Sequence, residues 1–285
     1  MSKLQKEFSI AKIIYKAMSR KKDPTEDFRP FSIRVNNFYC RRAQLEKFTK
    51  GFAHPNELPS FAFVATFKLV LQCLAQSNIT SNLMGLIHLN SDFNIATPHN
   101  WLLPTDIEVS IKDVTKDEKG LNYLVVTKLF QNGEITIINS NRMLDKDPSY
   151  RPSRSAPEKK QTKSLSKTLA STVLSIKTAW YYAWMSKDFN PIHLHPALAK
   201  QFGLKRALIH GMFNLHFSLK HILKSRTEKV SSIKVQFNRP CFLPNQIFLK
   251  NYTDTNEYGL FGKDQTERFL KIEIEDLVTQ QTESK

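Results

Sequence analysis

Two long apolar segments, each followed by strand-like segments, constrain the fold of this chain most. Residues 61–76 (FAFVATFKLVLQCLAQ) are long enough to form a buried helix. In residues 208–224 the apolar side chains recur at steps of four and three, which predicts one buried helical stripe. That stripe contains Leu208, Met212, Leu215, Leu219 and Ile222. A long helix followed by an antiparallel meander, twice, predicts two copies of a sheet wrapped around a helix.

The expected strands fall into two matching groups. In the first half they are 83–89, 106–114, 123–130 and 134–143, and in the second 233–237, 247–253, 258–262 and 268–274. Asn132-Gly133 separates the last two strands of the first group and is a strong hairpin signal. The sequence therefore predicts an α+β protein in which mainly neighbouring strands pair.

A polar segment divides the chain. Residues 144–163 (LDKDPSYRPSRSAPEKKQTK) contain three prolines, many charges and few apolar side chains, which predicts a linker. We therefore expect an N-terminal half over residues 1–143 and a C-terminal half over residues 164–285.

Composition narrows the class of protein. With 285 residues, 41% of them hydrophobic, the chain can bury a sizeable core. No apolar run approaches the ~18 residues of a membrane span, and the basic N-terminus lacks the pattern of a secretory signal. Three widely separated cysteines, Cys40, Cys73 and Cys241, fit a reducing compartment and have no metal-binding spacing. We therefore expect a cytoplasmic protein.

The charge balance favours an anionic partner. Lysine and arginine number 42 against 26 acidic residues, so the formal net charge is +16. Nucleic acid, an anionic membrane surface, the phosphates of coenzyme A and an acidic carrier protein are all candidates. The basic residues are spread along the chain, so a solubilising surface explains them equally well. Because the aromatic-rich basic motifs of common RNA-binding modules are missing, we expect no nucleic-acid partner.

The most informative short motif lies in the C-terminal half. Residues 186–193 (SKDFNPIH) place the carboxylate of Asp188 five positions before the imidazole of His193. A His-Gly-Met run follows at 210–212, near the start of the second expected helix. A carboxylate and an imidazole can move protons, and a glycine amide at a helix N-terminus can hold an oxyanion. Addition of water to a thioester, or its removal, needs this combination.

The motif carries a resemblance to a known family. Residues 184–213 (WMSKDFNPIHLHPALAKQFGLKRALIHGMF) closely resemble the hydratase motif of MaoC-like dehydratases and R-specific enoyl-CoA hydratases. The positions that match the family pattern are Ser186, Asp188, Asn190, Pro191, Ile192, His193, Phe202, Gly203, Ala207, His210, Gly211 and Met212. Outside this run the similarity lies only in the layout of the chain.

The resemblance implies a fold and a reaction. The fold is a double hotdog, in which each half is a long helix wrapped by a curved antiparallel sheet. The reaction is reversible hydration of a trans-2-enoyl thioester to a (3R)-3-hydroxyacyl thioester, carried by coenzyme A or acyl carrier protein (ACP), with no cofactor. The N-terminal half would be non-catalytic and would help to shape the acyl pocket. Such a chain can act alone or form a homodimer.

The resemblance also implies roles for individual residues. Asp188 and His193 would be the catalytic pair that activates water, and Gly211 would donate its N–H to the thioester oxygen. Ser186, Asn190 and His210 would support the site.

One position departs from the family pattern, because Lys187 replaces the glycine between Ser186 and Asp188. If that position has a positive φ, lysine strains the turn by about 1 kcal/mol. Its charge could also lower the pKa of Asp188. Alternatively, the side chain points outward and meets a phosphate of the carrier. Lys205 and Arg206 are candidates for the same role, or form a solvated basic pair.

Several alternatives stay open. The chain could be a catalytically silent hotdog that binds acyl thioesters, a nucleic-acid-associated protein or a thioesterase. His193 and His195 could bind a metal ion, but no third ligand has a telling spacing, so we expect no metal site. Residues 180–184 (WYYAW) are expected mainly to pack in the core. Asp92-x-Asn94 faintly echoes the motif in the first half, and we interpret it as chance.

Overall fold

The fold is seen in a computed structural model that describes residues 3–4, 12–13, 28–79, 81, 83–147, 149–150, 165–253 and 255–277. Its strands are β1 (Lys3–Leu4), β2 (Phe31–Phe38), β3 (Ile87–Ile95), β4 (Thr105–Asp117), β5 (Gly120–Gln131), β6 (Glu134–Lys146), β7 (Leu165–Leu174), β8 (Val230–Phe237), β9 (Asn245–Tyr252), β10 (Glu257–Phe261) and β11 (Arg268–Asp276). Its longer helices are α2 (Arg42–Gly51), α3 (Phe61–Gln76), α4 (Ile176–Ser186) and α7 (Gly211–Lys224). Short helices are α5 (Pro191–Leu194) and α6 (Pro196–Gln201), with single turns η1 (Pro55–Glu57) and η2 (Leu83–Gly85).

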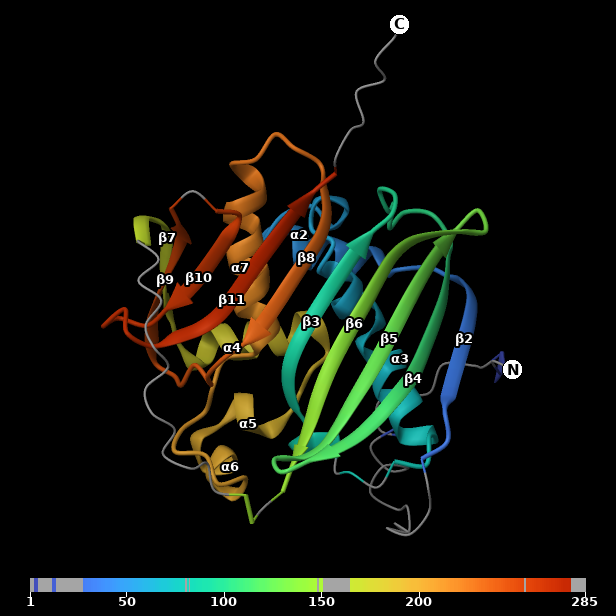
Figure 1. Ribbon diagram of the computed structural model, residues 1–285, viewed down its shortest axis with the longest axis horizontal. Coiled ribbons are helices and arrows are strands. Elements are labelled where there is room, and N and C mark those ends of the chain that lie inside the picture. Colours follow the sequence, from blue (N-terminus) through green and yellow to red (C-terminus); the bar gives the residue numbers. More distant parts are fainter. Residues whose placement is uncertain are drawn as a thin grey trace, which may run out of the picture.

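The two halves repeat one topology. In the first half, the chain order β2, α3, β3, β4, β5, β6 gives the sheet order β2-β4-β5-β6-β3. In the second, the chain order β7, α7, β8, β9, β10, β11 gives the sheet order β7-β9-β10-β11-β8. The sheets join where β3 pairs with β8, and α3 and α7 lie on the same side of the combined sheet (Figure 1). This repeat confirms the predicted α+β double hotdog.

The central helices follow from their apolar sequences. The first has the predicted bounds, Phe61–Gln76, and is buried on nearly all sides. It packs against four strands of its own sheet and against α4, and a helix that is apolar all round needs such cover. The second begins at Gly211, three residues later than the predicted Leu208, which instead forms a β-bridge with Phe242. The rest of its stripe is buried as expected.

The strand predictions hold apart from their ends and one segment. Residues 83–89 are not one strand, because η2 occupies 83–85 and β3 begins at Ile87. The β5–β6 hairpin is confirmed, with Asn132 and Gly133 at φ 52° and 83°, as a two-residue hairpin turn requires. Strands β2 and β7 were not anticipated. Strand β6 continues to Lys146, three residues past the expected end of the first half at 143. Most of the expected linker, 148 and 151–163, lies outside the described residues, so the division of the chain stays a prediction. Within the part of the chain that the structure describes, no helix is long and apolar enough to cross a membrane.

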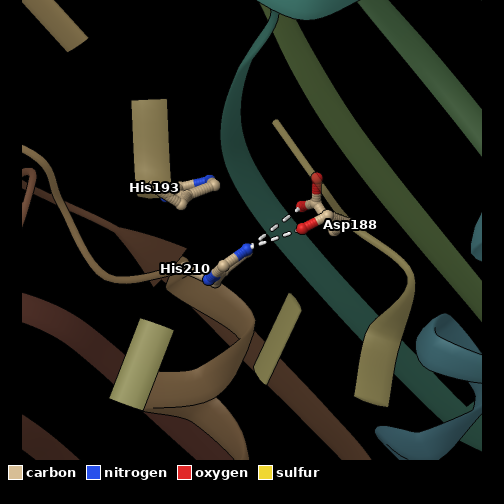
Figure 2. A group of neighbouring side chains, drawn as sticks. All are labelled: Asp188, His193 and His210. Carbon is tan, nitrogen blue, oxygen red and sulfur yellow. Dashed lines mark hydrogen bonds and ion pairs between the residues drawn. The ribbon is translucent and has the colours of Figure 1, made fainter. Parts of the chain in front are cut away.

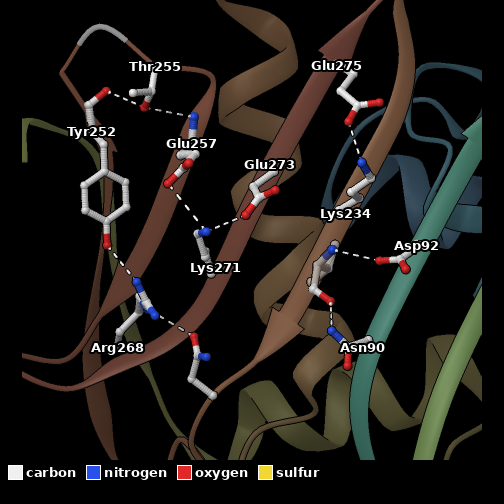
Figure 3. A network of polar contacts seen from close by, with 12 residues as sticks. Asn90, Asp92, Lys234, Tyr252, Thr255, Glu257, Arg268, Lys271, Glu273 and Glu275 are labelled. Carbon is white, nitrogen blue, oxygen red and sulfur yellow. Dashed lines mark hydrogen bonds and ion pairs between the residues drawn. The ribbon is translucent and has the colours of Figure 1, made fainter. Parts of the chain in front are cut away.

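Two side chains of β3 reinforce the junction between the halves. Asn90 Nδ2 donates to the main-chain oxygen of Val235 on β8 at 3.3 Å, and Val235 N–H donates to Asp92 Oδ1 at 3.3 Å (Figure 3). Only three residue pairs are in register between these strands. The side chains therefore supply hydrogen bonds that the short ladder does not, and Asp92 has a structural role at the junction.

We expect Asp92→Ala to lower the free energy of unfolding by about 1–2 kcal/mol, because the Val235 N–H loses a charged acceptor in a half-buried place. Urea denaturation followed by circular dichroism measures the change. Glu275→Ala is the control, since it removes the exposed ion pair with Lys234 on the outer face of the neighbouring strand and should change stability much less. Equal effects of the two substitutions would contradict this role of Asp92.

Candidate active site

The site begins where α4 ends. Lys187 follows the helix with φ 64° and ψ 17°, and its N–H donates to the oxygen of Ala183 at 2.8 Å. Helices commonly end on such a left-handed residue, which is usually glycine. Ser186 Oγ donates to the oxygen of Tyr182 at 2.8 Å and accepts from the N–H of Asp188 at 3.2 Å. Ser186 therefore fixes the turn that carries Asp188.

Asn190 holds the next part of the loop from both sides. Its N–H donates to Asp188 Oδ1 at 3.2 Å, and its own Oδ1 accepts from the N–H of Ile192 at 3.3 Å. The second bond caps α5, whose first residue is Pro191, a position at which the missing N–H of proline costs nothing. One residue thus positions the carboxylate of Asp188 and the short helix that carries His193.

Asp188, His193 and His210 converge from three segments of the chain (Figure 2). The two imidazole rings stack with centroids 3.7 Å apart. His210 Nε2 lies 3.0 Å from the main-chain oxygen of Asp188 and 4.0 Å from its Oδ2. The structure therefore brings the predicted pair together, and it places His210, which was expected only to support the site, at the centre of the group.

Main-chain acceptors define the tautomers of both imidazoles. His193 Nδ1 lies 2.9 Å from the oxygen of Leu208, and a carbonyl can only accept, so Nδ1 carries the proton. The same argument places a proton on His210 Nε2, which faces the oxygen of Asp188. His193 Nε2 therefore keeps a lone pair that can accept a proton, whereas His210 Nε2 donates its proton to the main-chain oxygen of Asp188.

Burial dominates the protonation of this group. It raises the pKa of Asp188, against the opposing effect of His193, and lowers the pKa of His193, against that of Asp188. Burial and the nearby His193 both hold the pKa of His210 well below its usual range. The possible lowering of the Asp188 pKa by Lys187 is not seen, because the groups that lower this pKa are His193 and the Asn190 N–H, and burial outweighs both. Two neutral imidazoles beside a carboxyl of raised pKa suit proton exchange near neutral pH.

The same three residues are the only His, Cys, Asp and Glu group spaced to hold a metal ion in the part of the chain that the structure describes. Sequence spacing alone did not suggest His210 as a third ligand. Because His193 Nδ1 and His210 Nε2 already donate to carbonyls, only His193 Nε2 and the carboxylate remain free toward a shared ligand. A zinc site usually needs three or four protein ligands. His195, the other metal candidate, instead caps α6 by accepting the Ala197 N–H at 3.1 Å.

Gly211 opens α7 directly after His210. As the first residue of the helix it has no intrahelical acceptor for its N–H, and it forms no main-chain bond among the described residues. A Cβ here would lie 2.9 Å from ring atoms of Phe237, so this position needs glycine as long as Phe237 keeps its place. A free N–H at a helix N-terminus beside the stacked imidazoles can hold a developing oxyanion.

The basic residues named from the sequence lie outside the group. Lys187 is exposed, and its Nζ lies 5.4 Å from the ring centroid of Trp184, so the side chain turns over that ring. Lys205 and Arg206 are exposed in the turn before α7, and the guanidinium of Arg206 lies 5.9 Å from the ring of Phe242. Their role in carrier binding therefore remains a prediction.

The aromatic run on α4 differs from its expectation. Trp180, Tyr181 and Trp184 are 42%, 44% and 56% exposed, so core packing is wrong for these three, while Tyr182 is buried. The aromatic side chains of this run lie on both the exposed and the buried face of α4. Aromatic content alone could not predict which of them would be buried.

Comparison with known protein families gives a match in the second half. Residues 153–258 match the family model described as a MaoC like domain. This region of the chain is therefore similar to MaoC-like domains. The match contains the whole loop from Ser186 to His193 and the start of α7. The sequence resemblance is thereby confirmed.

Individual relatives extend the likeness beyond that domain. A Mycobacterium tuberculosis protein named 3-hydroxyacyl-thioester dehydratase X is 24% identical over 198 residues, covering 68% of this chain and 69% of that protein. The crystal structure of HtdX from M. tuberculosis has a TM-score of 0.74 at 20% identity and covers 86% of this chain and 100% of that chain. Another M. tuberculosis structure, described as a double hotdog fold, has a TM-score of 0.53 at 10% identity and covers 88% and 96%. At these identities the structural likeness concerns the fold.

We expect Lys187→Gly to raise the free energy of unfolding by up to about 1 kcal/mol, because glycine adopts φ 64° without the Cβ strain that lysine bears. Urea denaturation measures the change. Lys187→Ala is the matched control, since it also removes the ammonium group but keeps the Cβ. An equal gain in stability from both substitutions would show that backbone strain is not the cause.

Proposed function

We propose that this chain catalyses the reversible hydration of trans-2-enoyl thioesters to (3R)-3-hydroxyacyl thioesters. The observation that carries the proposal is the convergence of Asp188, the free Nε2 of His193 and the helix-start N–H of Gly211 within a MaoC-like domain. The family match and the dehydratase relative support assignment to the hydro-lyases.

The proton transfers follow from the tautomers. One water molecule bound between the Asp188 carboxylate and His193 Nε2 faces both groups that can accept its proton. As its oxygen bonds to the β-carbon, the pair takes one proton from the water and one proton is returned to the α-carbon. The site therefore ends in its starting protonation state, and dehydration follows the same steps in reverse.

Negative charge develops on the thioester oxygen as water adds. The Gly211 N–H points from the first turn of α7, where unpaired N–H groups and the helix dipole favour an anion. A preorganised donor of this kind is typically worth about 3–4 kcal/mol in the barrier.

The first half contributes to the site through packing. His88 on β3 stacks on Phe63 of α3 and lies 4.7 Å from the ring of Phe237, the side chain that crowds Gly211. This contact supports a role of the first half in shaping acyl binding, and it makes His88 a packing residue whose pKa burial lowers to about 4.

A silent thioester-binding protein is the second candidate, and Lys187 is the feature that favours it. The lysine side chain is directed over Trp184, and Asp188 nevertheless lies within the group of Figure 2. The position of Asp188 beside His193 and His210 favours turnover over simple binding.

We expect Asp188→Asn to lower kcat for trans-2-enoyl-CoA by about 10²- to 10⁴-fold, because the amide cannot accept a proton. The absorbance of the conjugated enoyl thioester, measured at several chain lengths and with ACP-linked substrates, reports the rate. Because burial raises the pKa of Asp188, activity should fall as the pH drops through a value above that of an ordinary carboxyl group.

Asp264→Asn is the control, since that carboxylate is exposed on a turn outside the site. Release of free thiol would instead indicate a thioesterase. Binding of enoyl-CoA and enoyl-ACP without loss of absorbance, in a folded protein, would indicate the silent candidate and contradict the proposed reaction.

We expect Gly211→Pro to lower kcat by a further 10²- to 10³-fold or so relative to Gly211→Ala. Both substitutions add a Cβ against Phe237, but only proline removes the N–H. Proline is tolerated at the first position of a helix, and His210 already has the extended conformation, φ −60° and ψ 132°, that precedes proline. Equal rates for the two variants in the same assay would argue against Gly211 as the oxyanion donor.

A further inference from the structure

Three buried polar atoms behind the catalytic pair have no hydrogen-bond partner among the described residues. They are Tyr182 OH, His210 Nδ1 and His216 Nε2. Their side chains are 1%, 2% and 0% exposed. The Tyr182 ring lies 4.8 Å from the His210 ring and 5.8 Å from the His216 ring, so the three side chains pack in one cluster.

The chemistry of the three atoms is complementary. His210 is neutral with its proton on Nε2, so Nδ1 carries a lone pair and needs a donor. The Tyr182 phenol keeps its proton, because burial and the nearby Asp188 raise its pKa. His216 is also neutral, and its Nδ1 lies 2.8 Å from Ser60 Oγ, so Nε2 is the ring nitrogen that still needs a partner.

Buried polar groups nearly always find a partner, and where protein atoms do not supply it, a water with two to four polar contacts does. We propose that Tyr182 and His216 are positioning residues for the catalytic pair, which act through a buried water that binds Tyr182 OH, His210 Nδ1 and His216 Nε2. This water donates to His210 Nδ1 and thereby holds the proton of His210 on Nε2.

The fixed tautomer matters because His210 touches both members of the pair. Its Nε2–H holds the main chain of Asp188, and its ring stacks on His193 at 3.7 Å (Figure 2). With the proton on Nδ1 instead, a lone pair would face the oxygen of Asp188 and its carboxylate at 4.0 Å, and the loop would be repelled. The network extends to Ser60, directly before α3, so the first half also contributes to it.

The effect on catalysis rests on the proposed function, whereas the tautomer of His210 does not. We therefore measure the tautomer by NMR and the catalytic effect by kcat. In protein labelled with ¹⁵N-histidine, we expect long-range ¹H–¹⁵N spectra to show His210, assigned by the signals lost in His210→Gln, protonated on Nε2. Tyr182→Phe should shift these signals toward a mixture of tautomers and lower kcat about tenfold, with KM nearly unchanged. Ser60→Ala should shift them in the same direction by less.

Tyr123→Phe is the matched control, since it removes a buried hydroxyl that bonds to Ser81 in the first half. It should leave the His210 signals and kcat unchanged. A wild-type His210 protonated on Nδ1, or His210 signals that do not move in folded Tyr182→Phe, would overturn the inference. If the wild type turned over no enoyl thioester, the reaction would be wrong while the spectra would still decide the tautomer.

Discussion

The hydrogen bond from His210 Nε2 to the main-chain oxygen of Asp188 ties together two segments that are 22 residues apart in the sequence. It links the loop after α4 to the start of α7, and these are the places where a carboxylate and a free helix N–H are available. The bond also fixes one nitrogen of His210, and the stacked His193 is held in turn by the oxygen of Leu208. Burial supports the arrangement by keeping both imidazoles neutral, so they pack face to face without charge repulsion.

The repeated topology explains why one half can carry the site. Each half provides a long buried helix and a five-stranded sheet order, and β3 and β8 fuse the two sheets. In the second half, the connection between β7 and α7 contains α4, the Asp188 loop and two short helices. The equivalent connection in the first half contains α2 and η1 and lacks the Asp-x-Asn-Pro-x-His run. The common scaffold therefore supports the proposed catalytic residues in one half and packing residues such as His88 in the other.

Local patterns in the sequence were enough to predict α3, the β5–β6 hairpin and the pairing of Asp188 with His193, because each depends on residues close together in the chain. Strand β7 was missed because its sequence (LSKTLASTVL) mixes small, polar and apolar residues, and among the described strands it pairs with β9 alone. The central place of His210 and the exposure of Trp184 depend on how α4 packs against α7 and the first half, which periodicity does not define. The contact of His216 with Ser60 could not be predicted for the same reason, because it joins residues 156 positions apart in the sequence.

The fusion of the two sheets within one chain has a consequence for how the site persists. When two separate subunits build a site at their interface, dilution below the dissociation constant separates them. Here the half with the proposed site packs against a surface of the same polypeptide, through Asn90 and Asp92 of the first half and Val235 of the second. The local concentration of that surface therefore does not depend on how much protein is present. Such a site can operate at very low protein concentration. The two halves of the chain can also diverge in sequence and still remain associated, because they are covalently linked.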